Sequence, residues 1–156
     1  MMMKPIIYQL LPRTFANYNE TRKRNGTREE NGSGKFADIT PKALKAIQDL
    51  GATHVWYTGV IRHATAERNN PAITKGLAGS PYAITDYYDV DPDLAVDEEK
   101  RMAEFESLIR RTHKAGLKVI MDFVPNHVSR EYKSLCKPKG QRDLGEDDNP
   151  DWAFSP

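Results

Sequence analysis

The side chains best suited to chemistry in this 156-residue sequence lie close together near residue 122. Asp122 follows a run of apolar residues, and Asn126 and His127 come just after Pro125. A carboxylate at the end of a buried strand is costly unless it is paired or hydrogen-bonded, and proline stiffens the turn that carries the next two side chains. This arrangement is compatible with three roles: orienting sugar hydroxyls, binding a hard cation through oxygen atoms, or capping the end of a strand.

A second segment, residues 79–92, combines three tyrosines with several carboxylates. Aromatic faces such as that of Tyr82 can stack on the apolar C–H face of a pyranose ring, while neighbouring Asp and Thr side chains bind its hydroxyls. Alternatively, the tyrosines pin a long loop to the body of the protein. The residue types alone leave both interpretations open.

Other candidate motifs are weaker. The glycine-rich residues 25–35 match neither the phosphate-binding loop nor the dinucleotide fingerprint, and they predict an ordinary flexible turn or a calcium-type oxygen site. His54, His63 and His113 have no partner at metal-ligand spacing. Cys136 is the only cysteine, which excludes an internal disulfide and a thiolate metal cluster.

Composition narrows the classes of partner. The 23 basic and 22 acidic residues give a net charge of +1, which argues against nucleic acid as the main partner. No apolar stretch approaches the ~20 residues that cross a bilayer, and residues 1–11 lack the cleavage site of a secretory signal. We therefore expect no membrane partner, no organic cofactor and a cytoplasmic location.

Three apolar runs predict the strands that position these side chains. Residues 6–11, 54–58 and 118–124 are rich in β-branched or aromatic residues and lack a clean alternation of polar and apolar positions. This pattern is typical of strands buried on both faces, as in a parallel sheet.

Two helices are predicted between these strands. The first begins at Thr40 and Pro41, a typical N-cap followed by proline, and the second begins near Asp97. Gly51 and Gly116 end them. The expected inward-facing positions are Leu44, Ile47 and Leu50 in the first helix and Met102, Phe105, Leu108 and Ile109 in the second.

The order strand, helix, strand, helix, strand predicts an α/β fold built from βαβ units. The connections that follow the strands, residues 12–39 and 59–96, are long, whereas those that precede them are short. In parallel α/β folds the carboxyl ends of the strands carry the ligand site. Residues after 125 are polar and predict a loop.

In this order, the segments resemble the alpha-amylase family of glycoside hydrolases (family 13). The similarity is carried by residues 7–15, 51–57, 79–88 and 116–127, the last of which contains the pattern Asp-x-x-x-Asn-His. The resemblance implies a partial (β/α)₈ TIM barrel. Residues 1–127 would form roughly its first three β/α units, and residues 128–156 would begin an incomplete loop region or small domain after the third strand.

The resemblance also implies hydrolysis of α-glucosidic linkages in starch-like glucans or maltooligosaccharides by a retaining mechanism. The nucleophile and the acid/base would lie beyond Pro156, so this chain alone is expected to be inactive and to need the remaining barrel strands. Tyr82 would stack on the sugar, His127 would hydrogen-bond its hydroxyls, and Asp122 would hold neighbouring side chains in place. Asn126 stands at the position that binds calcium in the calcium-dependent members.

Two alternatives remain open. One is a non-catalytic amylase-like protein that binds sugar or acts as a scaffold, although the presence of Tyr82, Asp122 and His127 argues against it. The other is a different parallel α/β enzyme in which Asp122 and His127 support metal-assisted chemistry, although no second cluster has ligand spacing. Pro81 and Ala83 stand where the family usually has glycine and aspartate, so the sugar preference is left open.

Overall fold

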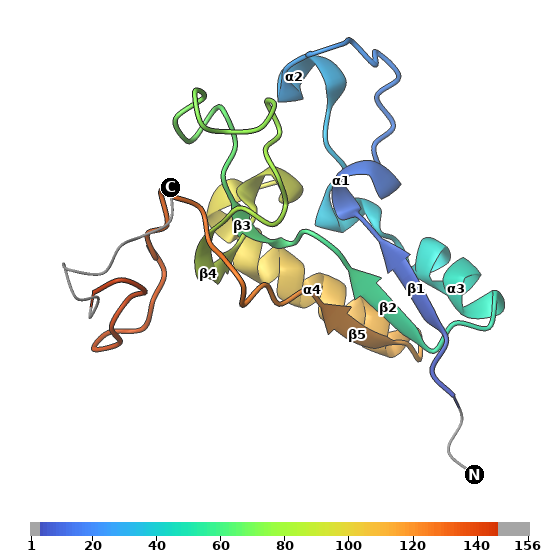
Figure 1. Ribbon diagram of the computed structural model, residues 1–156. Coiled ribbons are helices and arrows are strands. Elements are labelled where there is room, and N and C mark those ends of the chain that lie inside the picture. Colours follow the sequence, from blue (N-terminus) through green and yellow to red (C-terminus); the bar gives the residue numbers. More distant parts are fainter. Residues whose placement is uncertain (1–3, 147–156) are drawn as a thin grey trace.

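A computed structural model describes residues 4–146 of the chain (Figure 1). Its helices and strands follow one another as β1 (Ile7–Leu10), α1 (Pro12–Phe15), α2 (Arg28–Asn31), the 3₁₀ helix η1 (Phe36–Asp38), α3 (Pro41–Asp49), β2 (His54–Tyr57), β3 (Ile61–His63), β4 (Ile84–Val90), the 3₁₀ helices η2 (Pro92–Leu94) and η3 (Glu98–Lys100), α4 (Arg101–Lys114) and β5 (Lys118–Met121). Within residues 4–146, no helix has the length and apolar character needed to cross a membrane.

Three parallel strands form the central sheet in the order β1-β2-β5 (Figure 1). In the register, Val55 of the middle strand pairs with Tyr8 on one side and Val119 on the other. This arrangement confirms the predicted parallel α/β sheet, and each observed strand lies inside its predicted range. All three strands point toward the end of the molecule that carries the long loops (Figure 1).

Helix α3 begins and ends as its sequence predicts. The Thr40 hydroxyl accepts a hydrogen bond from the Ala43 amide (3.2 Å), which satisfies one of the free N–H groups of the first turn. Gly51 adopts a positive φ of 89° just after the helix, a conformation that costs glycine little. Leu44 and Ile47 are buried, but the prediction for Leu50 was wrong: it is 73% exposed, because it is the C-cap residue where the chain turns away.

Helix α4 buries Phe105 and Leu108 as predicted, with Ile109 partly buried against the core. Met102 does not belong to this inner stripe and is 40% exposed. The inward position of the first turn is taken by Arg101, whose guanidinium donates a hydrogen bond of 2.8 Å to Asp89. A buried ion pair has therefore replaced the expected apolar contact.

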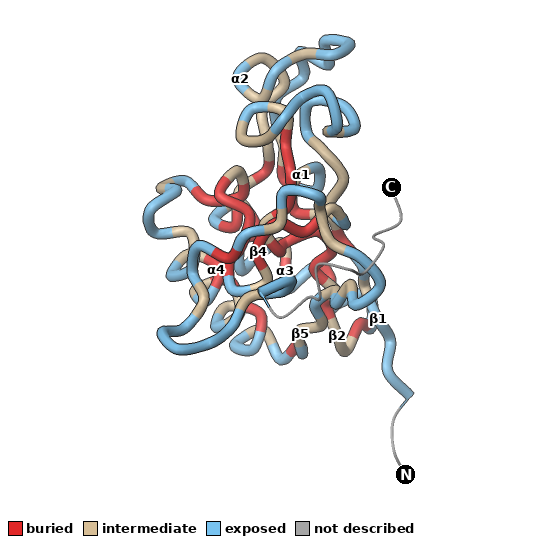
Figure 2. Tube along the Cα trace, turned by 60° about the vertical axis from the view of Figure 1, so that its left-hand side comes forward, coloured by how far each residue is buried: buried red, intermediate tan, exposed pale blue. Residues whose placement is uncertain are grey.

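Within residues 4–146, helices cover one face of the sheet and leave the opposite face without a helix (Figure 1). Val55 and Tyr57 are fully buried on the helix side, where α4 lies behind β2 and β5 (Figures 1 and 2). Successive side chains of a strand point to opposite faces, and the alternate residues are less buried: Ile7 is 49% exposed and β5 has no fully buried residue. The prediction that all three strands are buried on both faces was therefore wrong for residues 4–146.

The segment predicted as a loop between residues 59 and 96 contains an antiparallel hairpin. Strand β3 pairs with β4, placing Ile61 opposite Val90 and His63 opposite Ile84. Its sequence resembles a loop because carboxylates and tyrosines interrupt the apolar residues. The predicted loop 12–39 likewise contains short helices, α1, α2 and η1.

The polar segment after β5 agrees with its prediction as far as the structure describes it. Residues 122–146 form turns and bends without a helix or strand and run back past β4 (Figure 1). Residues 147–156, the last part of the predicted segment 128–156, lie outside the described residues. The proposed domain boundary at residue 127 stays a prediction.

Candidate functional site

Asp122 lies just after the carboxyl end of β5, on the sheet face opposite α4 (Figure 1). Its Oδ1 accepts a hydrogen bond of 2.5 Å from the Trp56 indole Nε1, and its Oδ2 accepts one of 3.0 Å from the Gly59 amide. Trp56 points to the same face because it alternates with the buried residues Val55 and Tyr57. Both carboxylate oxygens are thus engaged by one neighbouring segment, which relieves the cost of placing a charge there.

Tyr82 lies in a tight turn before β4. The Ala83 amide donates to the Ser80 carbonyl (3.0 Å), and the Tyr82 amide donates to the Ser80 hydroxyl (3.3 Å). The Tyr82 side chain is 41% exposed, so its ring has a face available to a ligand. The adjacent Pro81 packs closely against Gly59, the residue whose amide binds Asp122.

Asn126 and His127 are both exposed on the loop after β5, and the Asn126 Nδ2 lies 3.2 Å from the His127 Nδ1. They line a hollow of about 730 Å³ together with four aromatic residues, Tyr87, Tyr88, Phe123 and Tyr132. In that wall the Tyr87 ring centroid lies 6.0 Å from that of Phe123 and 5.8 Å from that of Tyr132. An imidazole and an amide beside aromatic faces can bind a polyhydroxylated ring by hydrogen bonds and stacking.

The predicted site residues therefore form two groups rather than one. Asp122 and Tyr82 are connected through Gly59 and Pro81, whereas Asn126 and His127 share the aromatic hollow. Among residues 4–146, no hydrogen bond or ring contact joins Tyr82 to His127. The sugar-binding roles of these residues stay predictions.

The sequence did not predict a charged cluster formed by Arg13, His63, Arg68 and Asp91. His63 and Asp91 are each 1% exposed, and the His63 Nδ1 lies 2.9 Å from an Asp91 carboxylate oxygen. Arg68 binds the same oxygen at 2.9 Å, and the Arg13 guanidinium lies 2.5 Å from the His63 Nε2. The His63 ring therefore lies between the two charged groups, with Nε2 toward Arg13 and Nδ1 toward Asp91.

This cluster perturbs the titration of its carboxylate. Burial by itself raises the pKa of Asp91, but the hydrogen bond from His63 and the positive charge of Arg68 outweigh it and lower the pKa to about 2. Arg13 follows β1 and the other groups belong to the β3–β4 hairpin and its flanks, so the cluster ties the first long loop to the hairpin. Spacing could not reveal it, because the partners of His63 are distant in sequence.

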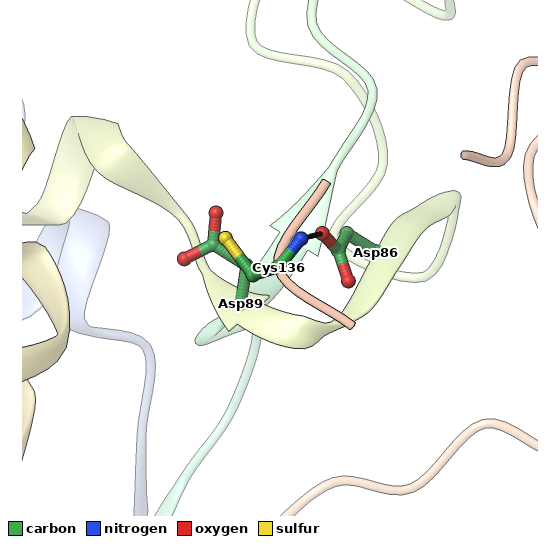
Figure 3. Close-up of side chains that lie close together, drawn as sticks. All are labelled: Asp86, Asp89 and Cys136. Carbon is green, nitrogen blue, oxygen red and sulfur yellow. Dashed lines mark hydrogen bonds between the residues drawn. The ribbon is translucent and has the colours of Figure 1, made fainter. Parts of the chain in front are cut away.

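The described residues contain one group of three side chains able to hold a metal: Asp86, Asp89 and Cys136 (Figure 3). Asp86 accepts from the Cys136 amide at 3.1 Å, and Asp89 binds the guanidinium groups of Arg62 and Arg101 at 2.9 and 2.8 Å. Burial raises the pKa of Asp89, but these two arginines outweigh it and leave the pKa below its usual value, while burial and the nearby carboxylates raise the pKa of the Cys136 thiol. Asp86 thus holds the backbone at Cys136 against β4, and Asp89 pairs with arginines of β3 and α4.

The calcium expectations find limited support in the side chains present. In the loop of residues 25–35, the Thr27 hydroxyl and the Glu30 carboxylate form a reciprocal cap on α2, and Lys23 pairs with Glu30. That loop is thus held by its own contacts. The Asn126 amide nitrogen donates to His127. Within residues 4–146, the group of side chains able to hold a metal, Asp86, Asp89 and Cys136, contains no residue adjacent to Asn126 in sequence. One amide oxygen is far from the six to eight oxygen ligands that calcium takes.

The model of the family "Alpha amylase, catalytic domain" matches residues 9–155. Maltase 1 of Drosophila virilis is 30% identical over 143 residues, which are 89% of this chain and 18% of the relative. Oligo-1,6-glucosidase of Parageobacillus thermoglucosidasius is 27% identical over 138 residues, 88% of this chain and 20% of the relative.

Among solved structures, an alpha-amylase from Lactobacillus plantarum superimposes with a TM-score of 0.58 at 31% sequence identity, covering 82% of this chain and 24% of that one. The chain spans about a fifth of the length of the curated relatives it matches.

Proposed function

Since the chain belongs to the alpha-amylase family of catalytic domains, we propose that the protein containing it is a glycoside hydrolase that cleaves α-glucosidic linkages. The observation that carries this proposal is the family match over residues 9–155, which includes the Asp122 to His127 segment. The relatives named maltase and oligo-1,6-glucosidase favour short α-glucosides as substrates over long starch chains, and their names differ in the linkage. The described sheet would supply the first three strands of a (β/α)₈ barrel.

In this proposal the described residues bind and orient the sugar and do not break the bond. Retaining hydrolysis needs two carboxyl groups about 5–5.5 Å apart that are free to act on the anomeric carbon and the leaving oxygen. Asp122 has both oxygens engaged, and Asp89 and Asp91 are held by arginines. We therefore expect the nucleophile and the acid/base to come from barrel strands other than β1, β2 and β5.

Two side chains are proposed to contact the reacting sugar. Tyr82 presents a half-exposed ring for stacking, and His127 presents an exposed imidazole for hydrogen bonds to hydroxyls. Calcium enters the proposal only at Asn126, whose amide oxygen would supply one ligand, while the other ligands would come from outside the described residues.

Steady-state kinetics of the complete enzyme on a short maltooligosaccharide test this assignment. Tyr82→Phe keeps the aromatic face and should be mild, whereas Tyr82→Ala should be severe. His127→Ala should lower both kcat and kcat/KM by roughly 10²–10³, as expected for loss of a polar contact worth about 2–4 kcal/mol in the transition state. Tyr18→Ala is the matched control, because Tyr18 is 80% exposed and should change neither constant.

If Tyr82→Ala and His127→Ala both leave kcat/KM within a factor of about two, neither side chain contacts the reacting sugar and the assignment is wrong. If the complete protein binds maltooligosaccharides but does not turn them over, the sugar-binding scaffold is the better description.

A further inference from the structure

Both oxygens of the Asp122 carboxylate accept hydrogen bonds from one short stretch of chain. The Trp56 indole N–H donates to Oδ1 at 2.5 Å, and the Gly59 amide donates to Oδ2 at 3.0 Å. Charge-assisted hydrogen bonds of this kind are the stronger ones in proteins. Asp122 thus fixes the backbone at Gly59 relative to β5.

Gly59 in turn lies next to Pro81, the residue that precedes Tyr82. It has a positive φ of 70°, and a Cβ atom at this position would lie 2.8 Å from the Pro81 Cβ and 3.1 Å from the Leu11 Cδ1. A side chain at position 59 would therefore collide with Pro81, and glycine allows the two residues to lie this near to each other. The position of the Gly59 backbone therefore limits the position of Pro81.

Tyr82 follows Pro81 in the same turn, so the position of Pro81 also restricts the position of Tyr82. Residues 80–83 close on themselves through the Ala83 amide and the Ser80 carbonyl, and the Ala83 carbonyl accepts from the Ala64 amide at 2.9 Å. The turn is consequently held from the β3 side by a hydrogen bond and from the sheet side by the Pro81–Gly59 contact. Tyr82 lies between these two supports with its ring half-exposed.

We propose that Trp56 is a positioning residue for Tyr82: its indole N–H orients Asp122, which holds Gly59 and Pro81 where the Tyr82 ring meets the sugar. This inference rests on the proposed function, because it assumes that Tyr82 stacks on the substrate. A second hydrogen bond fixes the segment that carries Gly59, since the Gln9 side-chain amide donates to the Thr58 hydroxyl at 2.8 Å. Trp56 has a role here that its place in the sheet does not require, because Val55 and Tyr57 already pack that strand onto the helices.

A spectroscopic test uses the chain with Trp152→Phe, which leaves Trp56 as the single tryptophan. The indole N–H proton of Trp56 should resonate downfield in an NMR spectrum and should move upfield in Asp122→Asn, because its carboxylate acceptor is lost. Asp49→Asn is the control, since Asp49 is an exposed carboxylate that pairs with Lys45, and it should leave the resonance unchanged. An indole resonance that is the same in Asp122→Asn and in the parent chain would overturn the inference.

A kinetic test uses a double-mutant cycle in the complete enzyme. Trp56→Phe removes the donor but keeps an aromatic ring, and it should lower kcat/KM for a maltooligosaccharide about tenfold. Tyr82→Ala should then cost at least about threefold less in the Trp56→Phe background than in the parent enzyme, because the ring is already misplaced. His127→Ala, the matched control, should cost the same factor in both backgrounds.

The outcomes separate the two proposals. If the Trp56→Phe and Tyr82→Ala factors multiply, Trp56 does not act through Tyr82, and the inference fails while the proposed function stands. If Tyr82→Ala alone has no effect, the assignment of Tyr82 to the sugar fails, and the inference fails with it. Thermal melts of Trp56→Phe show whether the fold is kept, and the NMR result decides the hydrogen bond independently of activity.

Discussion

Asp91 is predicted to stabilise the fold by an amount that depends on pH. Asp91→Asn removes the negative charge that faces His63 and Arg68 in a site that is 1% exposed. The pKa of Asp91 falls from 3.8 to about 2 on folding. At 1.36 kcal/mol per unit this is roughly 2.4 kcal/mol of stability in the ionised form. We expect the variant to lose about 2–3 kcal/mol at pH 7.

The direction with pH follows from the lowered value. Because the folded pKa lies below the unfolded one, the contribution of Asp91 is fully present above pH 3.8 and is lost as the pH falls through about 2. Urea unfolding of the parent chain and Asp91→Asn between pH 7 and pH 2 measures it, and by pH 2 most of the difference should have disappeared. Urea is preferable to guanidinium because it does not screen charges.

Asp49→Asn is the control for this experiment. Asp49 pairs with Lys45 on the surface of α3, where its side chain is 61% exposed, and exposed pairs of this kind contribute about 0.3–0.5 kcal/mol. The reasoning is refuted if Asp91→Asn costs no more than Asp49→Asn, or if its cost is the same at pH 2 as at pH 7.

Three further outcomes are expected. Burial raises the pKa of Tyr57 to about 12, so stability should fall by roughly 2.7 kcal/mol in total as the pH rises from below 10 to above 12, and alkaline urea titrations of Tyr57→Phe should lack this loss. The 156-residue chain should not hydrolyse aryl α-glucosides or maltooligosaccharides, and turnover that one of its own substitutions abolishes would contradict this. Because β1 and β5 each pair on one side only within residues 4–146, the chain should self-associate as its concentration rises in sedimentation velocity, whereas a concentration-independent monomer with a sharp reversible transition would oppose this.

The regular elements around the sheet could be predicted because their determinants are local. Thr40 with Pro41 begins α3, Gly51 ends it, and the apolar runs at β2 and β5 need no distant partner to be recognised. Leu50 was misplaced because periodicity does not show where a helix end turns away from the core.

The β3–β4 hairpin could not be predicted, because its stability depends on distant charges. The sequence of β4 and its end contains three carboxylates, Asp86, Asp89 and Asp91, and a hydropathy profile predicts such residues to be exposed to solvent. All three are buried. The neutralising groups come from residues 62, 68 and 101 and from the backbone near residue 136. No spacing rule connects positions that far apart.

The same limit applies to the candidate site. The Asp122 to His127 segment was recognisable because its residues are contiguous, and the need of Asp122 for hydrogen bonds could be stated in advance. Its actual donors, Trp56 and the Gly59 amide, lie more than 60 residues earlier and meet it only through strand register. The sequence likewise could not predict that Asp122 and Tyr82 form one group and Asn126 and His127 another.

The strand order β1-β2-β5 has a consequence for how the chain is made on the ribosome. Strand β2 can pair with β1 as soon as it emerges from the ribosome. Its other edge stays unpaired until β5 has been synthesised, and β5 begins at Lys118, 61 residues after Tyr57. At about 5–20 residues per second this edge stays unpaired for roughly 3–12 s. The β3–β4 hairpin and α4 are synthesised during that interval, so the hairpin, closed by its own ion pairs, can form beside the waiting edge before β5 arrives. Translation speed across residues 58–117 should therefore influence how much newly made chain aggregates.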